Sequence, residues 1–175
     1  MGDTQLLLYN STPYVSAETA LFSALIKSGE DRAHITLPAN LKMFLLGCLT
    51  EHLCNPDIVH RVLALDFYGA CLERGAERER LLKHTGDASL ILAGLYPERV
   101  LRLNVKSVYF RYMGRSAYSS LAAHLEVRRA TIDRSRLYQE VTQEFVALEQ
   151  VLKGARGRAE NEWDANRRIR AQLNF

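Results

Sequence analysis

The chain has 175 residues, of which 47% are apolar and 25% charged, a composition typical of one globular domain rather than of a disordered chain. Its longest apolar runs, 43–49 and 90–96, are far shorter than the ~20 residues of a membrane-spanning helix. The first residues lack the basic and apolar regions of a secretory signal, so we expect a cytoplasmic protein that does not enter a membrane.

Apolar residues recur at helical spacing, and no alternating β-branched run bounded by hairpin dipeptides occurs, so we expect an all-α protein. The motif Asn55-Pro56-Asp57 combines a capping residue, a first-turn proline and an acid, and it predicts a helix start. The turn His84-Thr85-Gly86-Asp87 is expected to separate a short charged helix from an apolar one. In this half of the chain we expect helices over residues 17–28, 38–52, 58–72, 77–84 and 87–95.

In the second half of the chain, Pro97 is expected to open a short helix, and a long helix should follow over residues 107–126. Apolar residues spaced by four, four, three and four predict a further helix over 137–152, which Gly154 and Gly157 should interrupt. The fold class is therefore a single-domain irregular helical bundle of about seven to eight helices. Residues 1–153 would form the helical domain, and residues 154–175 a basic amphipathic C-terminal arm or docking helix.

Positive charge is concentrated in one segment of the chain. Residues 99–136 carry nine basic and two acidic side chains, whereas residues 137–152 carry three glutamates and no base. Arg111 and Arg115 are four residues apart and share one side of the 107–126 helix, whose Val108 and Tyr112 are expected to face the core. The arginines could be solvated, could pair with the acidic segment, or could bind anions or nucleic acid beside exposed tyrosine. The candidate anion- or partner-binding residues are Arg99, Arg102, Lys106, Tyr109, Arg111 and Arg115.

A second candidate site is a pocket between the helix that begins at Asp87 and the helix that contains Gly114. A deep cavity there would suit a small-molecule ligand or a substrate. The sequence carries no G-x-S-x-G elbow or other catalytic motif, so we expect no catalytic residue and lean against an enzyme. The residues assigned to this possible pocket are His84, Asp87, Tyr112, Gly114 and Ser116.

Metal ions and cofactors are not expected. Cys48 and His52 are four residues apart, but a Cys/His zinc site needs four convergent ligands. The paired E-x-x-H motifs of a di-iron bundle and the glycine-rich loops that bind phosphates are both missing from the sequence. Each cysteine lies in an expected apolar helix and is interpreted as a buried thiol; the three are Cys48, Cys54 and Cys71.

The C-terminal arm is the third candidate. Its few large apolar residues stand among arginines, and it holds the only tryptophan of the chain. Such a segment could dock on its own domain, or it could bind a partner or a second copy of the chain. The residues assigned to this partner arm are Trp163, Arg167, Ile169 and Leu173.

Three runs of the sequence carry a resemblance: Gly86-Asp87-Ala88-Ser89-Leu90, the segment 93–99 (AGLYPER) and the segment 112–118 (YMGRSAY). Over about 35 residues this pattern resembles a family of uncharacterised proteobacterial all-helical proteins. The resemblance implies a bacterial cytoplasmic origin. It implies no activity and no site residues.

These observations favour a non-enzymatic interaction or regulatory protein that uses the basic Arg/Tyr surface and the C-terminal arm, with a protein partner or a homo-oligomer. Nucleic-acid binding through the same surface is the first alternative. A small-molecule-binding protein or enzyme with a pocket between the Asp87 and Gly114 helices is the second alternative.

Overall fold

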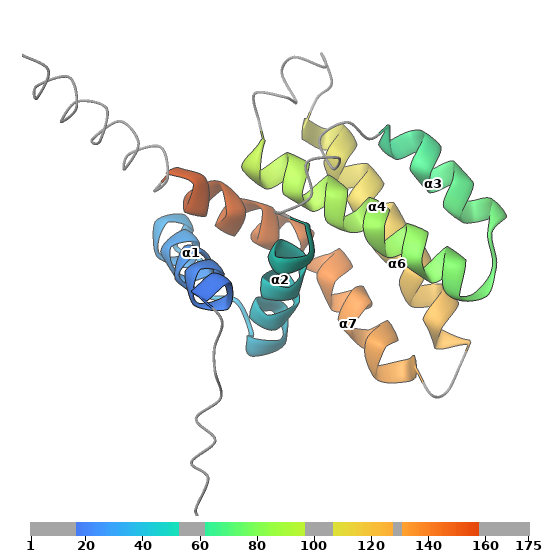
Figure 1. The fold of residues 1–175 in the computed structure, drawn as a ribbon, viewed down its shortest axis with the longest axis horizontal. Coiled ribbons are helices and arrows are strands. Elements are labelled where there is room, and N and C mark those ends of the chain that lie inside the picture. Colours follow the sequence, from blue (N-terminus) through green and yellow to red (C-terminus); the bar gives the residue numbers. More distant parts are fainter. Residues whose placement is uncertain (1–16, 53–61, 97–106, 128–130, 158–175) are drawn as a thin grey trace, which may run out of the picture.

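The computed structural model describes residues 17–52, 62–96, 107–127 and 131–157 (Figure 1). Every regular element in these residues is a helix, which confirms the expected all-α class. None of the described helices is long and apolar enough to span a bilayer. The elements are α1 (Ala17–Ala33), α2 (Ala39–His52), α3 (Leu63–Leu72), α4 (Gly75–Leu95), α6 (Ser107–Glu126), α7 (Ile132–Gln143) and a helix over 145–157. The starts expected at Pro56 and Pro97 and the tail beyond residue 157 lie outside the described residues.

Helix α4 forms the centre of the bundle, with α6 alongside it and the remaining helices around the pair (Figure 1). Ten consecutive residues, 85–94, are buried, as expected for a helix that other elements cover on all sides. Two polar residues in this run hydrogen-bond within the helix, since the Thr85 hydroxyl donates to the Leu81 carbonyl and the Ser89 hydroxyl to the Thr85 carbonyl. Polar side chains can thus be buried at the centre without leaving hydrogen bonds unmade.

The expected break at Gly86 is wrong, because α4 runs through it without interruption. The glycine serves packing instead: a Cβ at this position would collide with the ring of Tyr118 on α6. Gly114 on α6 has the same role, since a Cβ there would collide with the Phe145 ring and lie 3.0 Å from the Ser89 Cβ. Glycine costs up to ~1 kcal/mol in a helix, and the close approach of neighbouring rings offsets that cost.

The expected 137–152 helix is also divided differently. The structure has a bend at Glu144, between α7 and the helix over 145–157, and the second helix continues through Gly154. Gly154 lies against Gly29 of α1, where a Cβ on Gly154 would come 2.6 Å from the Gly29 carbonyl oxygen. A Cβ on Gly29 would in turn collide with the Val151 carbonyl. These glycines therefore allow the backbones of two helices to touch.

Apolar side chains form two adjoining cores. The larger one joins α1, α2, α6, α7 and the 145–157 helix, with Leu41, Leu45 and Phe145 fully buried. The smaller one lies between α3, α4 and α6 and contains Ile91 and Phe110. Helices α4 and α6 contribute residues to both cores, so the inward residues of α6 are apolar or small.

Replacing Gly29 with alanine should lower the free energy of unfolding by about 1–3 kcal/mol, because the added methyl group meets backbone that cannot move aside. Gly47, in the middle of α2, is the matched control because a Cβ added there would point into open space. Gly47→Ala should raise stability by up to ~1 kcal/mol through helix propensity. Urea denaturation of both variants checks this, and equal effects would contradict the proposed backbone contact.

Candidate functional site

The outward side of α3 carries an apolar stripe that no described residue covers. Val62, Leu65, Tyr68 and Leu72 are spaced by three, three and four residues, so they lie on one side of the helix, and each is between 57% and 68% exposed. The opposite side of α3 is buried through Leu63 and Ala70. We name these four residues the α3 face.

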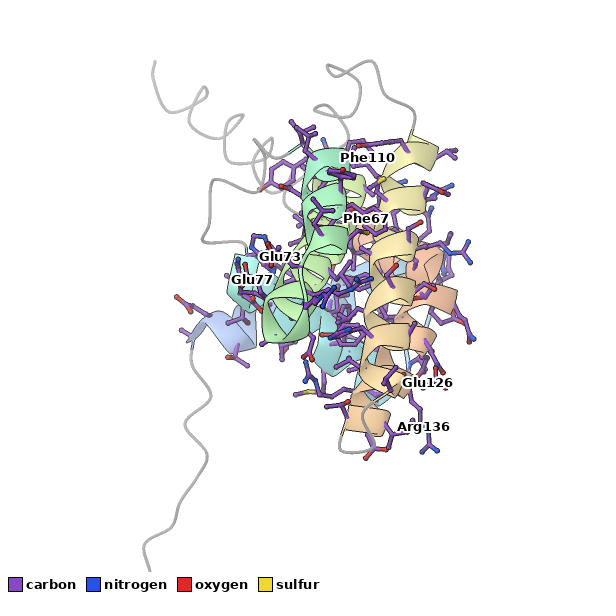
Figure 2. All side chains as sticks on the ribbon, turned by 90° about the vertical axis from the view of Figure 1, so that its right-hand side faces the viewer. Phe67, Glu73, Glu77, Phe110, Glu126 and Arg136 are labelled. Atoms are coloured by element: carbon purple, nitrogen blue, oxygen red, sulfur yellow. The ribbon has the colours of Figure 1, made fainter. Side chains whose placement is uncertain are left out.

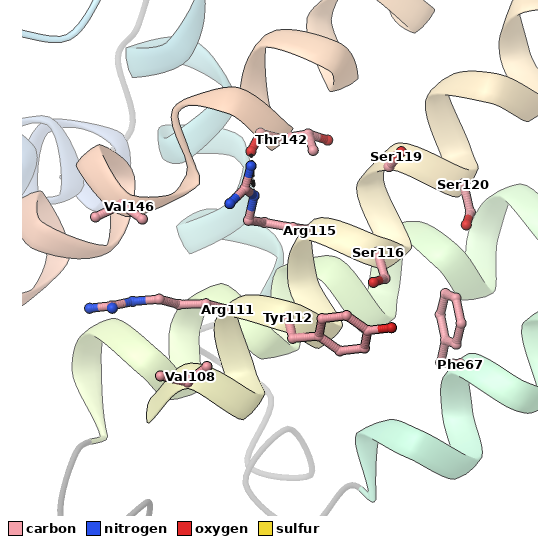
Figure 3. Close-up of a pocket in the computed structure, with 10 residues that line it drawn as sticks. All are labelled: Phe67, Val108, Arg111, Tyr112, Arg115, Ser116, Ser119, Ser120, Thr142 and Val146. Carbon is pink, nitrogen blue, oxygen red and sulfur yellow. Dashed lines mark hydrogen bonds between the residues drawn. The ribbon is translucent and has the colours of Figure 1, made fainter. Parts of the chain in front are cut away.

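Beside this helix lies a surface groove of about 780 Å³ along α6. Figure 2 shows α3 and α6 on the same side of the molecule, and Phe67 of α3 contributes to the groove wall. Tyr112 extends toward Phe67, and Val146 stands at the other side (Figure 3). The groove is lined by Phe67, Val108, Arg111, Tyr112, Arg115, Ser116, Ser119, Ser120, Thr142 and Val146. It combines aromatic and aliphatic groups with hydroxyls and two guanidinium groups.

Arg111 is held by a buried carboxylate. Its Nε donates to Glu149 Oε2 at 2.5 Å and a terminal nitrogen donates to Oε1 at 3.1 Å, a two-pronged contact that suits arginine geometry. Lys153 donates to the same Glu149 Oε1 at 2.5 Å. The Glu149 side chain has no exposed surface, so it needs cationic partners to be tolerated inside the protein. Arg111 thus pairs with the acidic 137–152 segment, one of the alternatives that the sequence left open.

Arg115 has a different environment. Its Nε donates to the Thr142 carbonyl oxygen at 3.2 Å, and it forms no ion pair with any residue that the structure describes (Figure 3). The groove is thus lined by two arginines, of which Arg111 is paired with Glu149 and Arg115 has no carboxylate partner among the described residues. The excess positive charge favours an anionic group at Arg115.

The remaining predicted site residues are scattered. Arg99, Arg102 and Lys106 lie outside the described residues, as do all four residues of the partner arm. Tyr109 is half-buried and packs edge-on against Phe110, at 5.3 Å between ring centroids. Val108 and Tyr112, expected in the core, are 62% and 69% exposed, because Phe110 and Met113 take the inward positions of α6.

The five residues of the expected pocket between the Asp87 and Gly114 helices do not line one cavity. Tyr112 and Ser116 line the groove, whereas Asp87 is fully buried inside α4 and Gly114 faces the Phe145 ring. Side chains of the core thus fill the space that the sequence assigned to a ligand.

Asp87 is instead the acceptor of a buried polar cluster that joins three helices. His52 Nε2 from α2, Lys83 Nζ from α4 and the Tyr118 hydroxyl from α6 each donate to its carboxylate at 2.7 Å. Asp87 and Tyr118 have no exposed surface and His52 has 1%. Only the edge of the cluster, at Lys83 and Glu51, is exposed, and its accepting carboxylate is not, so we interpret it as structural.

Asp87 and Lys83 each stabilise the charged form of the other. Burial raises the pKa of Asp87, but the hydrogen bond from His52 and the charge and hydrogen bond of Lys83 outweigh burial, and the pKa lies below its ordinary value. Burial lowers the pKa of Lys83, but Asp87 and Glu51 outweigh it and shift the pKa well upward. Among the described residues, Glu51, His52 and Asp87 bring possible metal ligands within 4.8 Å of one another. The Lys83 ammonium, 2.6 Å from Glu51 and 2.7 Å from Asp87, already supplies the cation.

The cysteines divide into two kinds. Cys48 is buried as expected, and burial raises the pKa of its thiol well above the ordinary value, so it stays neutral and unreactive. The expectation of a buried thiol is wrong for Cys71, which is exposed on α3. The reason is that α3 buries only one side, and Cys71 lies on the other. Cys54 lies outside the described residues.

Comparison of the chain with protein-family models, with curated proteins and with solved structures finds no match. The family resemblance therefore stays a prediction, and the site must be interpreted from its own geometry.

The α3 face was missed by sequence reasoning. The sequence predicted a helix over 58–72, and α3 lies within that range, but no exposed apolar side was assigned to it. One signal was present: α3 carries a single charged residue, Asp66, in ten. A helix that is apolar nearly all round normally has contacts on every side.

Replacing Asp87 with asparagine should lower the free energy of unfolding by about 1–3 kcal/mol, because the buried His52 and Tyr118 lose the carboxylate that accepts their hydrogen bonds and Lys83 keeps only Glu51. Asp31→Asn is the control, since Asp31 pairs with Lys27 on the open surface, and its removal should change little. Denaturant titration of the two variants checks this. A loss for D87N as small as that for D31N would contradict the assigned role.

Acid should act through the same carboxylate. Because the pKa of Asp87 is lowered by folding, its contribution to stability is complete above the ordinary value of 3.8 and is lost as the pH falls through the lower pKa of the folded state. The wild-type chain should lose stability over this range, and D87N should lose less. Urea midpoints measured as a function of pH test the difference, and parallel curves would show that Asp87 is not responsible.

Proposed function

We propose that the chain is a non-enzymatic interaction protein that binds a protein partner through the α3 face and the groove along α6. The observation that carries this proposal is the exposed α3 face. Monomeric proteins seldom leave contiguous apolar surface uncovered, and such patches commonly mark interaction sites. Four large side chains on one side of a short helix, each more than half exposed, form a patch of this kind.

The groove supports the same proposal. Tyr112 and Phe67 offer aromatic surface, and aromatic residues contribute most to binding energy in protein interfaces. The hydroxyls of Ser116 and Ser119 and the Arg115 guanidinium supply polar contacts at the rim, where specificity arises. An amphipathic helix fits such a surface, because it brings an apolar side flanked by charges.

Nucleic-acid binding has less support among the described residues. Phosphate recognition depends on several cations that are free to release counterions. Glu149 already neutralises Arg111. Of the two arginines of the basic Arg/Tyr surface that the structure describes, only Arg115 has no carboxylate partner among the described residues. A gel shift at low salt remains the decisive measurement for this alternative.

The proposed function predicts site-specific cross-links. A photoreactive benzoylphenylalanine at Leu65 or Tyr112 should form protein adducts in a lysate of the native cells, because both positions lie on the proposed interface. The same group at Lys27 is the control, since this exposed residue is on α1, at the opposite end of the molecule (Figure 1).

Adding Leu72→Glu should reduce the Leu65 adduct about tenfold, since a charge on the α3 face costs at least ~1.4 kcal/mol of binding. Adducts that form equally at Lys27, or none at Leu65 and Tyr112, would refute the proposed function.

A further inference from the structure

We propose that the partner includes a second copy of this chain, whose residues 158–175 bind the α3 face and the groove. This inference rests on the proposed function and names one occupant of its surface. We define residues 158–175 as the arm. The arm would place Trp163 in the groove and its neighbouring carboxylates at Arg115.

The residues that line the groove indicate which groups its occupant must carry. Arg115 has a backbone carbonyl as its described partner, and Arg111 and Lys153 share one carboxylate. An occupant with carboxylates removes this excess of positive charge. The apolar wall formed by Phe67 and Tyr112 requires a large apolar side chain next to those carboxylates.

The arm has this combination. Glu160, Glu162 and Asp164 lie within three residues of Trp163, the only tryptophan of the chain. The four arginines of the arm lie outside this acidic run, at positions 158, 167, 168 and 170. A tryptophan gives a large buried area, and its indole N–H can reach a hydroxyl at the edge of the groove. The other segments outside the described structure do not offer an aromatic residue among three acids; they are residues 1–16, 53–61, 97–106 and 128–130.

The length of the arm determines whether it can bind the groove of its own chain or only the groove of a second copy. Val146, at the groove wall, and residue 157 belong to one helix, so they are separated by about 16 Å along its axis. From residue 157 to Trp163 the arm spans six residues, which cover about 20 Å even when fully extended. That length is just enough to return to Val146 and leaves none to cross the groove. The arm therefore binds the groove of a second copy.

The rest of the arm fits the α3 face. Beyond Trp163 the arm carries two more large aliphatic residues, Ile169 and Leu173, within ten residues of the tryptophan. With Trp163 in the groove, Leu173 meets apolar side chains of α3 such as Leu65 or Leu72. Exchange in both directions gives a closed pair in which each copy donates one arm and accepts one, consistent with two-fold symmetry.

The test is the concentration dependence of mass and of tryptophan fluorescence. Sedimentation of the full chain should pass from one copy to two as concentration rises, and Trp163 emission should move to shorter wavelength over the same range. Trp163→Ala and Arg115→Glu should each weaken the association at least about tenfold. Arg136→Glu is the control for charge, because this exposed arginine lies on α7 outside the groove, and it should leave the association unchanged.

Reversing the charges on both sides distinguishes a direct contact between Arg115 and the acids of the arm from a general loss of association. A chain with Arg115→Glu together with Glu160→Lys, Glu162→Lys and Asp164→Lys should associate again, since both contacts of the pair are reversed in sign. Circular dichroism establishes that each variant keeps its helices. Failure of this rescue, with all variants folded, would overturn the assigned contact.

Other outcomes also decide. A single-copy mass at every concentration overturns arm exchange, and short-wavelength Trp163 emission under those conditions would place the arm on its own chain. A pair that persists unchanged in both W163A and R115E overturns the proposal as well. The proposed function is tested separately from arm exchange. If Leu65 cross-links to a different protein and the mass is that of a single copy, arm exchange is wrong and the proposed function stands. If no cross-link forms at all, the proposed function is wrong.

Discussion

The carboxylate of Asp87 is the interaction on which the arrangement of the central helices depends. It lies in the middle of a fully buried stretch of α4 and accepts hydrogen bonds from His52 on α2 and Tyr118 on α6, as well as from Lys83 of its own helix. A buried charge without these donors would cost several kcal/mol, so the three helices must keep one relative position. The register of α6 against α4 follows from this constraint.

That register determines which residues of α6 reach the surface. Tyr118 must point to Asp87, and Gly86 provides the space that its ring needs. With Tyr118 inward, Phe110 and Ala117 also turn toward the core, while Tyr112 and Arg115 turn outward beside α3. The hydrogen bond between Tyr118 and Asp87 thus helps to determine which residues of α6 line the groove.

The positions of the helices could be predicted from the sequence better than which side of each helix is buried. The spacing of apolar residues identified 107–126 as a helix with the correct ends, since its pattern is long and its ends are polar. It failed at Gly86 and Gly154, because a glycine that allows close packing looks the same in a sequence as one that ends a helix. It also placed Tyr112 in the core and missed the α3 face, because periodicity reports that a side is apolar and not whether anything covers it.

Among the described residues, buried charges have partners and a surface charge does not, and this contrast supports the proposed interface. The buried carboxylates have partners: Glu30 accepts from the Leu37 amide and pairs with Lys42, and Glu149 is held by Arg111 and Lys153. On the outside, Arg115 lacks a described acid and the neighbouring helix exposes a row of apolar groups. Folding thus gives these buried carboxylates their hydrogen-bond and ion-pair partners. Arg115 and the α3 face stay on the surface without such partners among the described residues. One macromolecule can supply both the acidic and the apolar contacts that they need.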